Sequence, residues 1–264
     1  MSESTYNVPT MAELTAKGET PEILFWVGCA GSYDERYQRV TQAFVKILNK
    51  AGISFAVLGS EETCTGDPAR RAGNEFMFQM QAMANIQVLD GYGVQKIVTA
   101  CPHCFNTLKN EYPDLGGSYE VIHHTTLLQQ LLDEGKIGVE GGEFKGKKVT
   151  FHDSCYLGRA NGIYEAPRKV LESLESDLVE MKRCRTTGLC CGAGGAQMFK
   201  EAEAGNKEIN VERTEEALET GAEIIASACP FCMTMLSDGV KNAEKEDKVQ
   251  VLDLAELIAK NQSL

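Results

Sequence analysis

The spacing of the cysteines repeats along this chain, and the repeat constrains the fold more than any other feature of the sequence. Four cysteines of the first half recur in the second half at offsets of 126, 126, 128 and 128 residues. The matched pairs are Cys29 and Cys155, Cys64 and Cys190, Cys101 and Cys229, and Cys104 and Cys232. The chain is therefore predicted to be a tandem duplication of roughly 125 residues per copy.

Each copy alternates apolar runs typical of buried strands with segments of helical periodicity. The expected strands cover residues 23–27, 53–58, 94–99, 119–122, 148–152, 178–181, 222–226 and 249–252. This alternation predicts an α/β protein in which helices cover parallel sheets. We expect one domain at residues 23–134 and a second at 148–264. A polar N-terminal tail, 1–22, precedes them, and a linker rich in Gly, Lys and Glu, 135–147, joins them.

The cysteines lie where such a fold binds ligands. They lie between predicted strands and the helices that follow, although Cys190 and Cys191 come some way after their strand. Ligands of parallel α/β sheets bind beyond the carboxyl ends of the strands. The helices that follow would present backbone N–H groups and a positive dipole, which favour thiolates. Pro102 and Pro230 suit the first turn of those helices.

The composition limits the chemistry of the ten cysteines. The first residues do not have the basic flank and apolar segment of a secretory signal. We therefore expect a cytoplasmic protein whose thiols are reduced or bound to metal. The net charge of −12 argues against nucleic acid or an anionic membrane surface as partner. No apolar run approaches the roughly 20 residues that span a bilayer.

The second copy carries one cysteine more than the first. Cys191 directly follows Cys190 and precedes the glycine-rich run Gly192-Ala193-Gly194-Gly195. Adjacent side chains on a strand point to opposite faces, so these glycines are expected to let both sulfurs face one object. The predicted cofactor ligands are Cys155, Cys190, Cys191, Cys229 and Cys232. Five thiolates exceed what zinc needs, so an iron–sulfur cluster is favoured over zinc or a metal-free thiol site.

The first copy offers four thiols, because Thr65 stands where the second copy has Cys191. The predicted metal ligands are Cys29, Cys64, Cys101 and Cys104. Four thiolates suit an ordinary [4Fe–4S] cluster and zinc equally well.

Other residues allow other interpretations. The Cys101-Pro-His-Cys104 motif read alone is typical of a thioredoxin-like dithiol, although its twin and the upstream cysteines argue against that hypothesis. Cys184 has no counterpart in the first copy and is expected to be a buried small hydrophobe. His123, His124 and His152 lie near strand ends and are expected to be satisfied core or loop histidines rather than catalytic ones.

These cysteine motifs resemble the duplicated cysteine-rich CCG domain of heterodisulfide reductase B and D subunits and of lactate and glycolate oxidation iron–sulfur subunits. The resemblance covers the chain from Ile23 onward. It implies two Rossmann-like halves related by a pseudo-twofold axis, with a noncubane [4Fe–4S] cluster on the five cysteines of the complete second motif. Thr65 leaves an ordinary [4Fe–4S] cluster, zinc or nothing for the first site.

The resemblance implies an oxidoreductase subunit that transfers electrons between a partner iron–sulfur protein and a thiol/disulfide, flavoprotein or quinone-linked acceptor. The chain has no ferredoxin-type cysteine run, so a separate ferredoxin-like subunit is expected, linked to a flavoprotein or to the membrane. The alternative function is a zinc-stabilised interaction module without redox chemistry. No residue is predicted to be catalytic.

Overall fold

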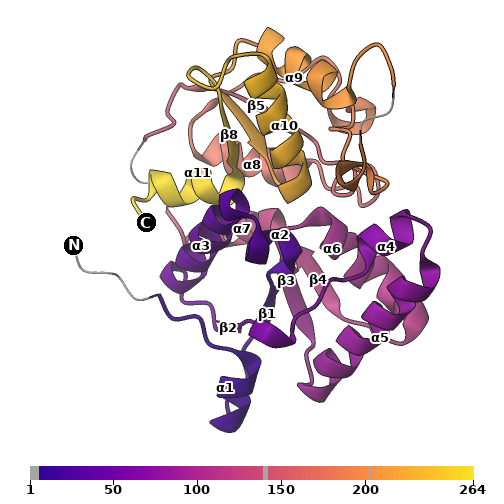
Figure 1. The fold of residues 1–264 in the computed structure, drawn as a ribbon. Helices are drawn as coiled ribbons and strands as arrows, with labels where there is room; N and C mark the ends of the chain where they lie inside the picture. Colours follow the sequence, from indigo (N-terminus) through magenta and orange to yellow (C-terminus); the bar gives the residue numbers. More distant parts are fainter. Residues whose placement is uncertain (1–5, 139–141, 202–203) are drawn as a thin grey trace.

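The computed structural model describes residues 6–138, 142–201 and 204–264 and contains two parallel sheets of four strands each. The strands are β1 (Ile23–Trp26), β2 (Phe55–Ala56), β3 (Lys96–Thr99), β4 (Glu120–His123), β5 (Lys148–Phe151), β6 (Asp177–Leu178), β7 (Ile224–Ser227) and β8 (Gln250–Asp253). Their orders are β2-β1-β3-β4 and β6-β5-β7-β8, so the second half repeats the first strand for strand. Figure 1 shows the first half below the second. The predicted α/β class with two tandem Rossmann-like halves is confirmed.

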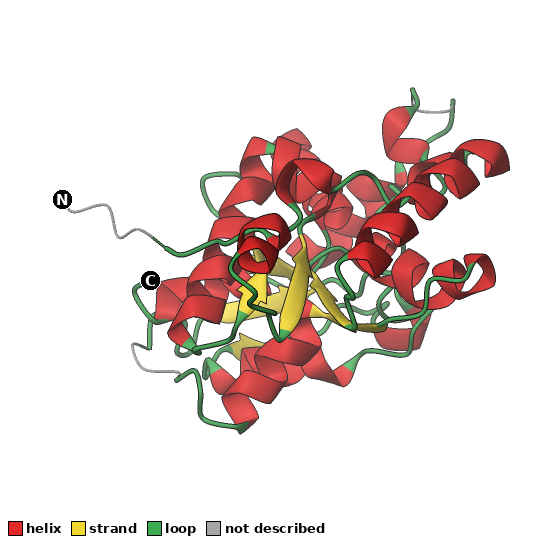
Figure 2. Cartoon of the chain, turned by 90° about the horizontal axis from the view of Figure 1, so that it is seen from below, coloured by secondary structure: helices red, strands yellow, loops and turns green. Residues whose placement is uncertain are grey.

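Helices surround both sheets (Figure 2). The helices are α1 (Met11–Ala16), α2 (Gly28–Tyr33), α3 (Glu35–Lys50), α4 (Asp67–Arg71), α5 (Glu75–Gly91), α6 (Pro102–Asn106), α7 (His124–Asp133), α8 (Glu165–Ser173), α9 (Ile209–Glu219), α10 (Pro230–Asn242) and α11 (Leu254–Asn261). The α3 helix shows why they form, because Asp34 caps its first turn and its apolar residues recur at helical spacing. Tyr37, Val40 and Phe44 of that face are buried.

The central strands are apolar on both faces because helices cover both sides. In the first sheet Leu24 pairs with Ile97, and in the second Val149 pairs with Ile224. The edge strands β2 and β6 are each two residues long, shorter than the predicted 53–58 and 178–181. After β2 the chain leaves the sheet through a short turn at Gly59–Glu61, which carries it toward Cys64.

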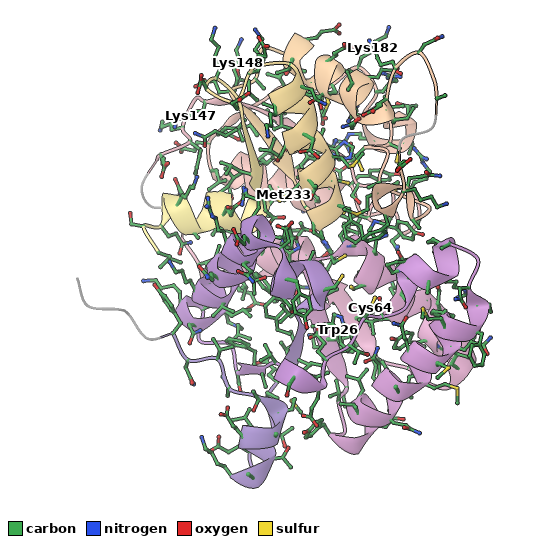
Figure 3. All side chains as sticks on the ribbon, viewed as in Figure 1. Trp26, Cys64, Lys147, Lys148, Lys182 and Met233 are labelled. Atoms are coloured by element: carbon green, nitrogen blue, oxygen red, sulfur yellow. The ribbon has the colours of Figure 1, made fainter. Side chains whose placement is uncertain are left out.

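The two halves pack against each other reciprocally, as pseudo-twofold symmetry requires. Helix α3 of the first half packs on α11 of the second, and α8 of the second half packs on α7 of the first. One continuous apolar core runs through both halves and includes Met233 of α10 (Figure 3). Arg36 of α3 also donates two hydrogen bonds, 2.7 and 2.8 Å long, to the carboxylate of Glu256 in α11.

A short helix lies within the segment that the sequence analysis described as a polar tail. Thr10 caps α1 through a capping box with Glu13, and Met11 and Leu14 are buried. The backbone of Thr10 also forms a parallel bridge with Val57. The described part of this segment is therefore attached to the first sheet beside β2.

Candidate metal centre

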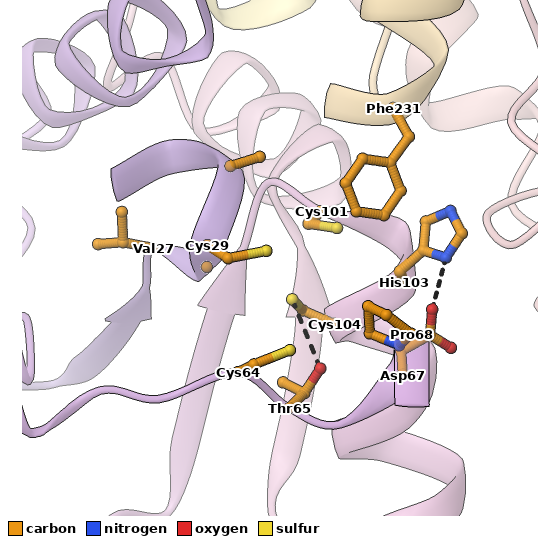
Figure 4. Close-up of a pocket in the computed structure, with 12 residues that line it drawn as sticks. Val27, Cys29, Cys64, Thr65, Asp67, Pro68, Cys101, His103, Cys104 and Phe231 are labelled. Atoms are coloured by element: carbon orange, nitrogen blue, oxygen red, sulfur yellow. Dashed lines mark hydrogen bonds and ion pairs between the residues drawn. The ribbon is translucent and has the colours of Figure 1, made fainter. Parts of the chain in front are cut away.

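The first four cysteines converge on one pocket at the carboxyl ends of the strands. Cys29 lies in α2 directly after β1, Cys64 lies in the loop after β2, and Cys101 caps α6 directly after β3. Their sulfurs and that of Cys104 line the same pocket, which Figure 4 shows. Pro102 occupies the first turn of α6, as predicted.

Within this pocket the thiols contact each other in pairs. Cys29 lies in hydrogen-bonding contact with Cys64, and Cys101 with Cys104. The hydrogen bond with Cys29 lowers the pKa of Cys64 to about 7, and the Gly66 N–H donates to the same sulfur at 3.4 Å. Backbone N–H groups aimed at sulfur favour the thiolate that a metal requires.

Thr65 occupies the position equivalent to Cys191 and makes a similar contact. Its hydroxyl donates to the sulfur of Cys104 at 3.8 Å (Figure 4). In the second half Cys191 makes the equivalent contact with Cys232. The two halves therefore share one arrangement, and a hydroxyl replaces the fifth thiol in the first half.

The five cysteines of the second half form one chain of sulfur contacts. Cys155 contacts Cys190, which contacts Cys191. Cys191 contacts Cys232, which contacts Cys229. Cys191, Cys229 and Cys232 are buried, and Cys155 and Cys190 are partly exposed. The structure therefore brings together all five residues predicted at the second site.

The backbone conformation two residues after Cys64 matches that two residues after Cys190. Gly66 and Gly192 occupy equivalent positions and adopt left-handed φ values of +90° and +94°. Each donates its N–H to the sulfur two residues earlier, at 3.4 Å to Cys64 and 3.3 Å to Cys190. Hydrogen bonds with Cys155 and Cys191, together with this N–H, hold the pKa of Cys190 far below its ordinary value.

A buried ion pair fixes the loops around the second site. The Asp153 carboxylate accepts two hydrogen bonds of 2.9 Å from Arg168 and one of 2.6 Å from the Arg185 N–H. Asp153 precedes Cys155, and Arg185 begins the turn that leads to Cys190. This carboxylate therefore ties together two of the segments that carry the sulfurs.

His103 lies between the two sets of cysteines. Its Nδ1 is 2.9 Å from Asp67, and its ring packs on Phe231 with centroids 4.7 Å apart (Figure 4). Burial opposes protonation, but hydrogen bonds with Asp67 and Cys229 hold the pKa of His103 well above its ordinary value. Asp67 and His103 were not predicted as site residues from the sequence. Comparison of the two repeats could have identified them, because the equivalent positions of the second half carry the apolar residues Ala193 and Phe231.

The other histidines occupy buried positions with different partners. His124 Nε2 is 2.9 Å from Asp253, and His123 Nδ1 is 2.8 Å from Thr125. His152 Nδ1 accepts a 3.0 Å hydrogen bond from Arg213 Nε, while His152 Nε2 has no partner among the described residues. Burial, with the nearby Arg213 charge, lowers the pKa of His152 to about 3.

All ten cysteines lie in the described part of the chain and are free thiols. Cys184 is only partly buried, which corrects the expectation of a buried hydrophobe. It follows Lys182 and Arg183 and has Glu180, Arg168 and Asp153 as charged neighbours, so its surroundings are largely ionic.

The residues of the second site fit an iron–sulfur cluster. Thiolate is the ligand that such clusters and zinc prefer, and the second site gathers more thiols than one zinc ion takes. A backbone N–H already points at the Cys190 sulfur, and the N–H groups that tune such clusters have this arrangement. The first site fits a four-thiolate metal of either kind.

The chain belongs to the cysteine-rich CCG domain family, whose model matches residues 23–109 and 149–237. This confirms the resemblance. The chain is 49% identical over 255 residues to the probable iron–sulfur-binding oxidoreductase FadF of Bacillus subtilis, covering 96% of this chain and 36% of that protein. It is 47% identical over 253 residues to the EtfAB:quinone oxidoreductase of Syntrophomonas wolfei, covering 94% of this chain and 35% of that protein.

A further relative is the D-type subunit of the dihydromethanophenazine:CoB–CoM heterodisulfide reductase of Methanosarcina barkeri. The identity is 39% over 249 residues, covering 90% of this chain and 58% of that relative. The chain thus spans between about a third and three fifths of the length of these relatives. Among the described residues, no helix has both the length and the apolar character needed to cross a bilayer.

Proposed function

We propose that this chain is an iron–sulfur redox module of a heterodisulfide-reductase-like complex. It transfers electrons between a partner iron–sulfur protein and a thiol/disulfide, flavoprotein or quinone-linked acceptor. The convergence of five thiols in the second half carries the proposal, because one zinc ion leaves such a set incompletely used. The three relatives are named as oxidoreductases or as part of a reductase, which supports redox chemistry over a zinc-stabilised interaction module.

In this proposal the second domain, 148–264, holds a [4Fe–4S] cluster of noncubane type. Cys155, Cys190, Cys191, Cys229 and Cys232 are its ligands. When bound, such a cluster supplies one-electron transfer at a potential that its surroundings set. Burial of Cys191, Cys229 and Cys232 excludes water from one side, whereas the partly exposed Cys155 and Cys190 leave the other side open to an electron partner.

The first domain, 23–134, holds a second metal centre through Cys29, Cys64, Cys101 and Cys104. Four thiolates hold either a [4Fe–4S] cluster or zinc. The partner would be a ferredoxin-like iron–sulfur protein linked to a flavoprotein or to a membrane complex, and the chain itself would contact the membrane only through that partner. The names of the FadF and EtfAB:quinone relatives support such a redox chain.

The experiment is metal analysis of protein purified without oxygen, with electron paramagnetic resonance (EPR) of the reduced and oxidised forms. We expect iron and acid-labile sulfide in the wild type, and an altered cluster spectrum in Cys191→Ser. Cys184→Ser is the matched control, because Cys184 is not one of the five proposed ligands and has charged side chains as its neighbours, so its substitution should leave the spectrum unchanged. Zinc without iron or sulfide in the wild type would refute the proposal.

A further inference from the structure

The imidazole of His152 lies against the second set of sulfurs. His152 follows β5 directly, and its side chain is fully buried. One of its ring nitrogens and the sulfurs of Cys191 and Cys232 all lie within 4.8 Å of one another. These three side chains could be interpreted as a metal-binding triad. Whether His152 can bind metal depends on which ring nitrogen carries the proton.

Arg213 determines which nitrogen of the ring carries the proton. Its Nε–H donates to His152 Nδ1 at 3.0 Å, and a guanidinium can only donate. Arg213 is itself fully buried and fixed, since its Nη1 donates to the Arg183 carbonyl at 2.7 Å and to Glu216 at 3.2 Å. His152 Nδ1 must therefore be the acceptor, and the hydrogen-bond network assigns the proton of the neutral ring to Nε2.

This tautomer prevents His152 from binding metal. The lone pair of Nδ1 is used by Arg213, and Nε2 has no lone pair to offer while it carries hydrogen. The Nε2–H group is nevertheless buried without a partner among the described residues. A buried donor without a partner is unfavourable, so a group that completes the site is expected to accept from it.

We infer that His152 is a positioning residue that donates a hydrogen bond from Nε2–H to a sulfur of the cluster at the second site, with Arg213 fixing its tautomer. The inference rests on the proposed function, because it needs the cluster there. The sulfur that accepts is either a cysteine thiolate or an inorganic sulfide. Trp26 stands at the equivalent position of the first half, and its Nε1–H is likewise buried without a partner among the described residues.

The expected consequence is a higher reduction potential. Electron transfer to a cluster adds negative charge to its sulfurs, and N–H donors stabilise that charge. His152→Leu removes the donor, whereas His152→Gln keeps an N–H group on a side chain of similar length. We expect His152→Leu to make reduction about tenfold less favourable, the size of one hydrogen bond to a charged group. Tenfold corresponds to about 59 mV toward negative potential for one electron.

The test is an EPR-monitored redox titration of the wild type and both variants, with iron and sulfide counted in each. A lower potential in His152→Leu, largely restored in His152→Gln at equal iron content, supports the inference. An unchanged potential in His152→Leu at equal iron content overturns it and leaves the proposed function intact. Absence of iron from the wild type instead overturns the proposed function.

A second measurement needs no folded variant of His152. Pulsed EPR on wild-type protein labelled with 15N-histidine distinguishes a nitrogen bound to iron, which couples strongly, from one hydrogen-bonded to sulfur, which couples weakly. His103→Phe, which introduces the residue found at the equivalent position 231, removes the histidine that is hydrogen-bonded with Cys229, so its signal can be told apart from that of His152. We expect weak coupling together with a proton that exchanges in D2O. Strong coupling, or none after His103→Phe, would refute the hydrogen bond.

Discussion

Substitution of the glycine after the paired cysteines should weaken the second site more than substitution of its neighbours. Gly192 adopts φ +94°, and a Cβ there would lie 3.3 Å from Ile209 Cβ and 3.4 Å from Met235 Cε. The left-handed conformation costs a non-glycine residue about 1–2 kcal/mol. Crowding of a packed site adds about 1–3 kcal/mol. We therefore expect Gly192→Ala to lower the free energy of unfolding by about 2–5 kcal/mol.

The same turn contains two matched controls. Gly195 has φ +66° but open space around a Cβ, so Gly195→Ala should cost only the strain, about 1–2 kcal/mol. Gly194 has no positive φ and no atom within 4 Å, so Gly194→Ala should be neutral or stabilise by about 0.4–1 kcal/mol. Urea unfolding of the three variants, purified without oxygen and followed by circular dichroism, measures this order.

The rate of iron loss distinguishes backbone strain at Gly192 from a direct effect on the cluster site. If the backbone of the Gly192→Ala variant relaxes to a negative φ at this position, the N–H turns away from the Cys190 sulfur that it reaches at 3.3 Å in the wild type. Gly192→Ala should therefore lose iron faster in the presence of a chelator than Gly195→Ala. Equal stabilities for all three variants, or faster iron loss from Gly194→Ala, would show that the backbone of Gly192 does not organise the site.

Two further predictions concern the first site and the interface between the halves. Thr65→Cys completes a five-thiol set in the first half. If the first site holds zinc, iron and sulfide per chain should rise and zinc should fall; if it holds a [4Fe–4S] cluster, iron should stay constant and the EPR spectrum should gain a second signal like that of the second site. Unchanged metal content together with an unchanged EPR spectrum would contradict the equivalence of the two sites. Arg36→Ala should lower the free energy of unfolding in urea by about 1 kcal/mol, because Glu256 loses its ion-pair partner and keeps only the Asp253 N–H, and because Arg36 is itself a third exposed. Arg39→Ala, on the same helix and without an ion pair among the described residues, should change it by less than about 0.5 kcal/mol, and an equal loss in both variants would refute the role of the pair.

Local signals in the sequence predicted the parts of the structure that depend on near neighbours. The central strands and α3 follow from apolar periodicity, and the starts of α6 and α10 follow from Pro102 and Pro230. The α1 helix was missed although its capping box, Thr10-x-x-Glu13, is visible in the sequence, because only one turn and a half follows it. The predicted edge strands were too long because apolar residues alone do not reveal where pairing stops.

Contacts between distant residues could not be predicted in the same way. Asp67 and His103 are 36 residues apart, and His152 and Arg213 are 61 apart. Each pair lies within one half: Asp67 of α4 meets His103 of α6 in the first, and Arg213 of α9 meets His152 after β5 in the second. These contacts depend on how helices pack beside the ends of the strands, which the local sequence does not show. The cysteines could be assigned to two sites because their matching spacing in the two repeats is visible in the sequence. The polar partners around them depend on tertiary packing.

The two halves differ at three equivalent positions beside the sites. Thr65, Asp67 and His103 in the first half correspond to Cys191, Ala193 and Phe231 in the second. The first half has a hydroxyl where the second has a thiol, and it has a buried hydrogen bond between His103 and Asp67. In the second half the thiol of Cys191 lies beside the apolar Ala193 and Phe231. His103 and Phe231 then pack on each other at the junction, and the first half places an imidazole in hydrogen-bonding reach of Cys229 in the second site. A hydrogen-bond donor beside a thiolate stabilises its negative charge. A residue that distinguishes the first half, His103, therefore serves the second site, and the two halves together form the surroundings of Cys229.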